Sequence, residues 1–134
     1  MNKEILIVHT AWYQEYISKM LAISQETLED FNCTNAVAPG ALELAALAAQ
    51  KLQDSSFIGV LFLGIVIRGE TSHYELVTKE TFRSISNLSL NKCKLAIINN
   101  VICVENIEQL EARLVKNSTN NANALIQLIH EKSS

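Results

Sequence analysis

Two patterns of apolar residues alternate along the chain: short continuous runs and stripes with helical spacing. The continuous runs at 5–9, 36–38, 57–67 and 93–98 predict strands that are buried on both faces of a sheet. The run at 57–67 is the longest and is broken only by two glycines. We therefore expect it to be the central strand, since it is rich in branched residues that favour strands.

Stripes of helical spacing separate these runs. They predict helices within 12–30, across 44–52 and from 72 to 88, and then two shorter amphipathic helices at 105–114 and 122–129. Each stripe would place one apolar face of its helix against the sheet.

Short polar or turn-forming segments mark the predicted boundaries. Residues 32–35 are interpreted as the exit of the first helix, and Pro39–Gly40 as the turn into the second. Ser72, with Glu75 three residues later, predicts a capping box at the start of the third helix. The Asn-rich stretch 117–121 is expected to separate or kink the last two helices.

The resulting element order alternates strands and helices. This order predicts an α/β fold, a three-layer α/β/α sandwich of the flavodoxin-like kind, with a four-stranded, mainly parallel sheet and helices on both faces. We find no internal repeat and no linker, so 1–134 is expected to be a single domain.

Composition narrows the function classes. The chain has 134 residues, 49% of them hydrophobic, and a formal charge of −3 without a basic stripe, so disorder and nucleic-acid binding are poor hypotheses. Its three cysteines lack the spacing of a zinc or redox motif, and reduced, mostly buried thiols are expected. No run is long enough to span a membrane, and no secretory signal is evident, so we expect a cytoplasmic protein.

Ligands of open parallel sheets bind outside the carboxyl ends of the strands. The residues expected at that edge are Trp12, 39–43, 66–73 and 99–102. The loop 68–71 precedes a helix start and predicts a small anion site, with phosphate the natural ligand, although the same residues fit a plain turn and cap.

Three side chains at this edge could carry chemistry. His73, in a first helical turn, would stay neutral and could move protons, or it could be a solvated surface residue. Glu43 could accept hydrogen bonds from ligand hydroxyls or complement the helix dipole. Trp12 could stack on a flat heterocycle or belong to the core. No nucleophilic triad, dinucleotide-binding glycine motif or Walker lysine loop is present.

Three segments at these loops resemble the lumazine synthase family. Segment 37–44, reading Val-Ala-Pro-Gly-Ala-Leu-Glu-Leu, is similar to the family's Val-Pro-Gly-Ala-Phe-Glu-Ile. Segment 63–74, reading Leu-Gly-Ile-Val-Ile-Arg-Gly-Glu-Thr-Ser-His-Tyr, is similar to its most specific motif, and 104–109 matches the stretch before its catalytic arginine, here Arg113. The spacing of the three segments also fits, over nearly the whole chain.

The resemblance implies an activity and its residues. Family members are transferases of riboflavin biosynthesis, the 6,7-dimethyl-8-ribityllumazine synthases. They condense 5-amino-6-ribitylamino-pyrimidinedione with 3,4-dihydroxy-2-butanone 4-phosphate, release phosphate and water, and use no metal or organic cofactor. Catalysis would come mostly from proximity and orientation. The implied catalytic residues are His73 for proton transfer and Arg113 for phosphate binding. Of the implied substrate contacts, Trp12 would lie on the pyrimidine, Ala41, Leu42 and Glu43 on the ribityl chain, and Val66 and Ile67 on the ring. Gly69, Glu70 and Thr71 would bind the phosphate, and Asn99 is a further implied contact.

The chain departs from the family pattern at several positions. Leu42 replaces a phenylalanine and Ala45 a proline, which alters packing near the ribityl chain. Asn99 stands where an aromatic residue is often found. The family's lysine after Arg113 aligns with Asn121, so its phosphate contact is lost unless Lys116 replaces it, and the family's glycines are missing from this loop.

The resemblance also implies self-association. In the family each site lies between neighbouring subunits of a pentamer, with the residues equivalent to Asn99 and Arg113 supplied by the adjacent chain. Pentamers remain alone or build a hollow 60-subunit shell. The short segment before the first strand favours a pentamer without a shell.

Two other readings remain open. An archaeal-type riboflavin synthase shares this fold and would dismutate two lumazines, but it has no need for a phosphate site. A flavin- or lumazine-binding or shell-forming homologue without catalysis would fit the missing lysine. Retention of Glu43, His73 and Arg113 together favours the synthase.

Overall fold

Four strands pair in parallel in the order β2-β1-β3-β4 and form one sheet. The computed structural model describes residues 2–69 and 73–133. The strands are β1 (Glu4–Thr10), β2 (Asn32–Ala38), β3 (Gly59–Ile67) and β4 (Ala96–Val104). β3 is buried along all but its last residue, which confirms the expected central strand.

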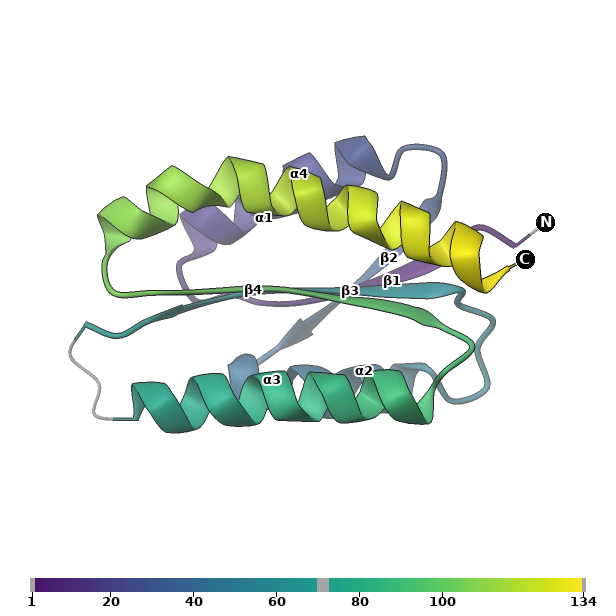
Figure 1. The fold of residues 1–134 in the computed structure, drawn as a ribbon, viewed down its shortest axis with the longest axis horizontal. Helices are drawn as coiled ribbons and strands as arrows, with labels where there is room; N and C mark the ends of the chain where they lie inside the picture. The colour runs from purple at the N-terminus through teal and green to yellow at the C-terminus, as the bar shows by residue number, and fades with distance from the viewer. Residues whose placement is uncertain (1, 70–72, 134) are drawn as a thin grey trace.

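Helices cover both faces of this sheet (Figure 1). On one face lie α1 (Gln14–Thr27) and α4 (Ile107–Lys132), and on the other lie α2 (Leu44–Lys51) and α3 (Tyr74–Asn91). A short 3-10 helix, η1 (Ala41–Glu43), leads into α2. The three-layer α/β/α fold predicted from the sequence is therefore confirmed.

Alternate residues of each strand fill two separate cores. In β1, Ile5 and Ile7 pack toward α1 and α4, whereas Leu6 and Val8 pack toward α2 and α3. Burying one such side chain contributes about 1.5–3 kcal/mol. Since both faces of the sheet are covered, the inner strands β1 and β3 carry continuous buried runs rather than alternating ones.

The start of α4 is fixed by reciprocal hydrogen bonds. The Asn106 side chain accepts a bond from the Gln109 backbone N–H at 2.9 Å, and the Gln109 side chain accepts one from the Glu105 N–H at 2.7 Å. Two otherwise unpaired donors are satisfied in this way. The helix therefore begins at Ile107 rather than at residue 105.

The expected break in the last helix is wrong. Residues 117–121 lie inside the continuous helix α4. Ser118 is fully buried against the sheet, and the Asn121 amide donates a 2.7 Å hydrogen bond to the Asn100 side chain. Tertiary contacts thus override the low helix propensity of the asparagines.

Two strand boundaries also differ from expectation. β2 begins at Asn32 rather than at residue 36, because 32–35 pair with β1 from Glu4 onward. β4 covers 96–104 rather than 93–98, because its pairing with β3 continues to Val104 beside Ile67. Residues 99–102 therefore lie within a strand and not in a loop. Both β2 and β4 are edge strands, which can expose polar residues.

The expected capping box lies partly outside the described residues. α3 begins at Tyr74, with His73 as its N-terminal flanking residue. Ser72 falls outside the described ranges, and the Glu75 carboxylate binds Arg68.

Candidate active site

The order of the strands defines where a ligand would bind. α1 follows β1 on one face of the sheet and α3 follows β3 on the other (Figure 1). The topological switch point therefore lies between β1 and β3, and open α/β sheets bind ligands outside the carboxyl ends at this point. The last pair between the two strands is His9 with Leu63, and β3 continues to Ile67 beside β4.

Trp12 is held at the end of β1. Its indole N–H donates a 3.0 Å hydrogen bond to the Pro39 carbonyl, which joins the segments that follow β1 and β2. The side chain is nevertheless 65% exposed. The next residue, Tyr13, has a φ of 59°, a left-handed conformation that costs about 1–2 kcal/mol. A strained turn thus presents a fixed, accessible aromatic ring that suits stacking on a flat heterocycle.

The predicted ribityl contacts lie together in η1, after β2. Ala41 is half-buried, while Leu42 and Glu43 are exposed. A Cβ atom on Gly40 would lie 2.9 Å from a carboxylate oxygen of Glu43, so this carboxylate folds back over the Gly40 backbone. A small residue at Gly40 therefore leaves room for an acceptor group at the carboxyl end of β2.

The end of β3 leads to the predicted anion site. Val66 is buried and Ile67 half-buried at the end of the strand, and Gly69 follows with a φ of +38°, which favours glycine. Glu70 and Thr71, two predicted phosphate contacts, lie outside the described residues. His73 is exposed at the start of α3, and its carbonyl accepts a 2.9 Å hydrogen bond from the Val77 N–H.

Arg68 links three elements beside this site. Its Nη1 lies 2.5 Å from the Glu75 carboxylate, and its Nε lies 2.7 Å from the Glu105 carboxylate. Its guanidinium also stacks on the Tyr74 ring, 4.6 Å from the centroid. The hydrogen bond from Arg68 lowers the pKa of Glu75 below its ordinary value. Sequence reasoning counted Arg68 only as a loop residue and missed these contacts.

Arg113 and Asn99 lie on α4 and β4. The Arg113 side chain is exposed, and within residues 2–69 and 73–133 no hydrogen bond or ion pair engages its guanidinium. Asn99 is half-buried on the edge strand β4, and its side-chain oxygen accepts a 2.8 Å bond from the Val101 N–H. Covering a backbone donor in this way protects an open sheet edge.

A buried amide network joins β4 to α4. The Asn100 side chain is 2% exposed; it donates to the Ser118 hydroxyl at 3.2 Å and accepts from Asn121 at 2.7 Å. Asn121, the position aligned with the family's lysine, thus joins helix α4 to strand β4 and is not a loop residue. Lys116 lies on the exposed face of the same helix.

Thr10 is a further polar group at this edge that sequence reasoning missed. Its hydroxyl is buried at the carboxyl end of β1 and has no hydrogen-bond partner among the described residues. The signal available in the sequence was a threonine directly ending an apolar run. Buried hydroxyls are normally satisfied, so this one marks a position where a partner would be favourable.

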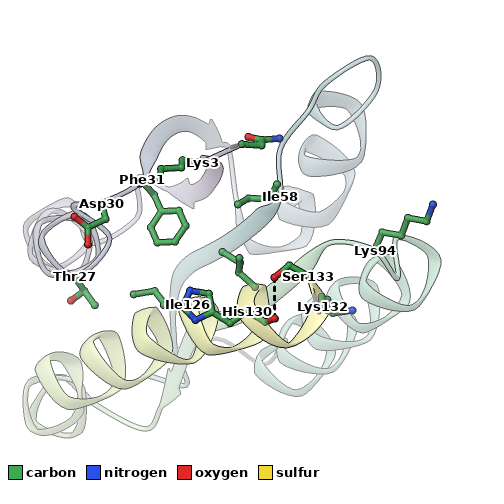
Figure 2. A pocket seen from close by; sticks show the side chains of 12 residues that line it. Lys3, Thr27, Asp30, Phe31, Ile58, Lys94, Ile126, His130, Lys132 and Ser133 are labelled. Carbon is green, nitrogen blue, oxygen red and sulfur yellow. Dashed lines mark hydrogen bonds between the residues drawn. The ribbon is translucent and has the colours of Figure 1, made fainter.

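The amino ends of the strands carry a cavity of about 670 Å³ (Figure 2). Phe31, Ile58 and Ile126 line its apolar part, and the exposed residues Asp30 and His130 lie at its rim. The charged and polar side chains that line it are exposed or half-buried. The predicted site residues lie elsewhere.

The cysteines are unpaired but only partly buried. Cys33 and Cys103 are half-buried, whereas Cys93 is exposed, which corrects the expectation that the thiols are mostly buried. Burial raises the pKa of the Cys103 thiol to about 11. This thiol is therefore protonated near neutral pH and is a poor nucleophile.

The described part of the chain shows neither a cluster of metal ligands nor a helix that could cross a membrane. No group of three or more His, Cys, Asp or Glu side chains there could hold a metal ion. Of the helices in the same ranges, none combines the length and apolar character needed to cross a membrane.

Comparison with known proteins agrees with this arrangement. The family model described as 6,7-dimethyl-8-ribityllumazine synthase matches residues 2–133. Proteins of that name are similar to the chain: one from Methylobacillus flagellatus is 39% identical, covering 75% of this chain and 67% of its own. One from Bartonella tribocorum is 35% identical, and the match covers 87% of this chain and 78% of the relative. One from Leuconostoc mesenteroides is 31% identical, and the match covers 96% of this chain and 88% of the relative. These matches confirm the resemblance seen in the loop motifs: the chain belongs to the 6,7-dimethyl-8-ribityllumazine synthase family.

Proposed function

We propose that the chain condenses 5-amino-6-ribitylamino-pyrimidinedione with 3,4-dihydroxy-2-butanone 4-phosphate to give 6,7-dimethyl-8-ribityllumazine. Family membership supports this activity over the riboflavin synthase and the non-catalytic alternatives. The reaction needs no nucleophilic side chain, because the amine of one substrate attacks the carbonyl of the other. The protein's task is to hold the two reactants together and to move protons.

The observation that carries the proposal is the meeting of three predicted contacts at the switch point. Trp12 is fixed by the Pro39 carbonyl, η1 follows directly, and the end of β3 lies on the other side of the switch point. Trp12 would stack on the pyrimidine, Ala41 to Glu43 would bind the ribityl hydroxyls, and backbone groups of Val66 and Ile67 would bind the ring edge.

The phosphate would bind near the start of α3. Gly69 is exposed near this point, and the N-terminus of a long helix favours an anion. His73 stands at that terminus and would transfer protons during imine formation and phosphate loss. Glu70 and Thr71 remain predictions from the motif.

Arg113 would complete the phosphate site from a neighbouring subunit. Its exposed guanidinium is not engaged by any described residue, and its planar fork suits a phosphate. Asn99 would enter the same shared site from edge strand β4. α3 also exposes three large apolar side chains, Leu76, Phe82 and Leu90, which supports burial against another copy. We propose a pentamer as the working assembly.

The activity is tested by mixing the purified chain with both substrates and following lumazine absorbance against the uncatalysed background. We expect product faster than background, and a loss of about 10²-fold in kcat/KM for the butanone phosphate in Arg113→Ala. Arg83→Ala is the matched control, since Arg83 is an exposed arginine on α3 that pairs with Glu80. No acceleration, with lumazine still bound, would instead support a binding protein.

The assembly is tested by sedimentation. A pentamer of the 14.9 kDa chain has a mass of about 75 kDa. A single species at this mass supports the pentamer, a much larger particle supports the shell, and a monomer that is fully active contradicts a shared site.

A further inference from the structure

Arg68 contacts three side chains at the carboxyl edge of the sheet. We call Arg68, Tyr74, Glu75 and Glu105 the Arg68 cluster. The guanidinium uses Nη1 for Glu75 at 2.5 Å and Nε for Glu105 at 2.7 Å, while its plane stacks on Tyr74. The backbone N–H of Arg68 also donates a 2.9 Å bond to the Val104 carbonyl. One residue at the end of β3 therefore holds the end of β4 and the first turn of α3.

The cluster joins the residues that precede and follow segment 69–73. Arg68 directly precedes this segment, and Tyr74 and Glu75 directly follow it. Gly69 begins the segment in a left-handed conformation. His73 is the covalent neighbour of Tyr74, so any displacement of the first turn of α3 moves His73 with it.

Stability alone does not account for this cluster. The side chains of Arg68, Glu75 and Glu105 are between 42% and 67% exposed, and exposed ion pairs add little to folding. Contacts with Glu75, Glu105 and Tyr74 together do, however, fix the orientation of the planar Arg68 guanidinium. Lysine, a point charge on a flexible stem, could not reproduce them.

The charges also indicate that Arg68 is not a ligand for phosphate. Two carboxylates surround its single positive charge, so little of that charge is available to an anion. The lowered pKa of Glu75 follows from the same pairing. The role left for Arg68 is to hold other groups in place.

We infer that Arg68 is a positioning residue for the proposed condensation, holding the first turn of α3 and thereby His73 at the carboxyl edge through Glu75, Glu105 and Tyr74. The inference rests on the proposed function for its catalytic consequence. The structural part stands independently, since it concerns how firmly the start of α3 is held.

The structural part is tested by amide hydrogen exchange of the whole protein, measured by NMR. The reporter is the Val77 N–H, which closes the first turn of α3 on the His73 carbonyl. We expect Arg68→Gln to speed its exchange severalfold and Glu75→Gln to speed it less, since Glu75 is one of three Arg68 partners. The double variant should add little to Arg68→Gln, because the pair between Arg68 and Glu75 is already lost. Arg83→Gln, which removes an ion pair within the same helix, should leave Val77 unchanged.

The catalytic part is tested by steady-state kinetics of the same variants. Arg68→Gln should lower kcat about tenfold with the KM for the pyrimidine changed less than twofold. Arg68→Lys should be equally slow, because it restores charge but not the fork, and Arg83→Gln should match the unsubstituted chain. Full activity in Arg68→Lys, or unchanged Val77 exchange in Arg68→Gln, would overturn the inference, as would a lower thermal midpoint with normal rates. If the unsubstituted chain itself forms no product, the proposed function fails, and Val77 exchange still decides whether the cluster holds the helix.

Discussion

The two ends of the sheet hold their polar groups in different ways. At the carboxyl ends, hydrogen bonds and ion pairs fix side chains of the candidate site, as in the bond from Trp12 to Pro39 and the pairs of Arg68. At the amino ends, side chains surround an open cavity of about 670 Å³ (Figure 2). Beside it, the Lys132 ammonium donates a hydrogen bond to the Cys93 carbonyl, which ties the end of α4 to the segment after α3.

This difference shows that volume is a poor guide to the site here. Catalysis by orientation needs groups that are already fixed before the substrate arrives, because each group ordered on binding costs free energy. At the carboxyl ends, the Trp12 ring and the Arg68 guanidinium are held in this way before any ligand binds. The following predictions test the contrast.

Replacing the two histidines at opposite ends gives the sharpest contrast in rate. His73→Gln, at the start of α3, should lower kcat about 10²-fold, the lower end of what a general acid or base contributes. Activity should remain above background, because orientation of the reactants is retained. His130→Gln, at the rim of the amino-end cavity, should leave kcat within twofold.

Steady-state kinetics of the two variants provides the check. A loss in His130→Gln as large as that in His73→Gln would break the comparison, since chemistry would then depend on the amino end.

Two cysteines give a similar contrast in reactivity. Cys103, on β4, has a thiol pKa of about 11 because of burial, whereas Cys93 is exposed beyond the end of α3. At pH 8 the thiolate fraction of Cys103 should be roughly ninetyfold below that of a thiol with the ordinary value of 9.0. Iodoacetamide should therefore label Cys93 first, and labelling of Cys103 should rise tenfold per pH unit toward pH 11.

The same pKa shift predicts a change of stability with pH. The unfolded chain loses the Cys103 proton near pH 9 while the folded chain keeps it up to about pH 11. The contribution to stability is thus complete below pH 9 and is lost as the pH rises to about 11. In urea unfolding, Cys103→Ala should reduce this loss of stability between pH 9 and pH 11. For the labelling experiment, equal modification of Cys93 and Cys103, measured by mass spectrometry, would contradict the raised pKa of Cys103.

Local patterns predicted the layers of the fold but not all boundaries. The strand at Gly59–Ile67 was predictable because burial on both faces imposes a continuous apolar run. β2 and β4 extend past their apolar runs because pairing with β1 and β3 adds polar residues that an edge strand can expose. Residues 117–121 are helical because contacts with β4 compensate for weak propensity, and such contacts are not visible in a local window.

Some residues of the candidate site could be predicted from the sequence, whereas others depend on tertiary contacts. Trp12, Glu43 and His73 follow strand ends and could be predicted from order along the chain. The Arg68 cluster could not, because Glu105 reaches Arg68 only after β4 has paired beside β3. The amide network of Asn100 depends likewise on the packing of α4 over β4.

The amide network offers a test of how α4 is held on the carboxyl half of β4. Asn100→Ala removes the partner of both Ser118 and Asn121 and leaves buried polar groups unpaired, so it should cost about 2 kcal/mol of unfolding free energy. Asn99→Ala loses one half-buried bond to the Val101 N–H and should cost about half as much. Urea unfolding measures both. Equal costs would mean that the buried network does not anchor the helix.

The smallest expected effects are those of alanine substitutions at two glycines of the carboxyl edge, Gly69 and Gly40. Comparing them distinguishes backbone strain from steric contact. At Gly69 the nearest atom of the described residues to an added Cβ would be 3.8 Å away, but the φ of +38° disfavours any side chain, so Gly69→Ala should cost about 1 kcal/mol. At Gly40 the backbone is extended, and the Cβ would meet the flexible end of Glu43 at 2.9 Å. Gly40→Ala should therefore leave stability within about 0.5 kcal/mol while raising the KM for the pyrimidine, because the displaced carboxylate is the proposed ribityl acceptor. Thermal unfolding measures the stability of both variants, and steady-state kinetics measures the KM of Gly40→Ala. An unchanged KM would mean that the position of Glu43 over Gly40 does not serve binding. The fixed geometry of the carboxyl edge would then depend on Trp12 and Arg68.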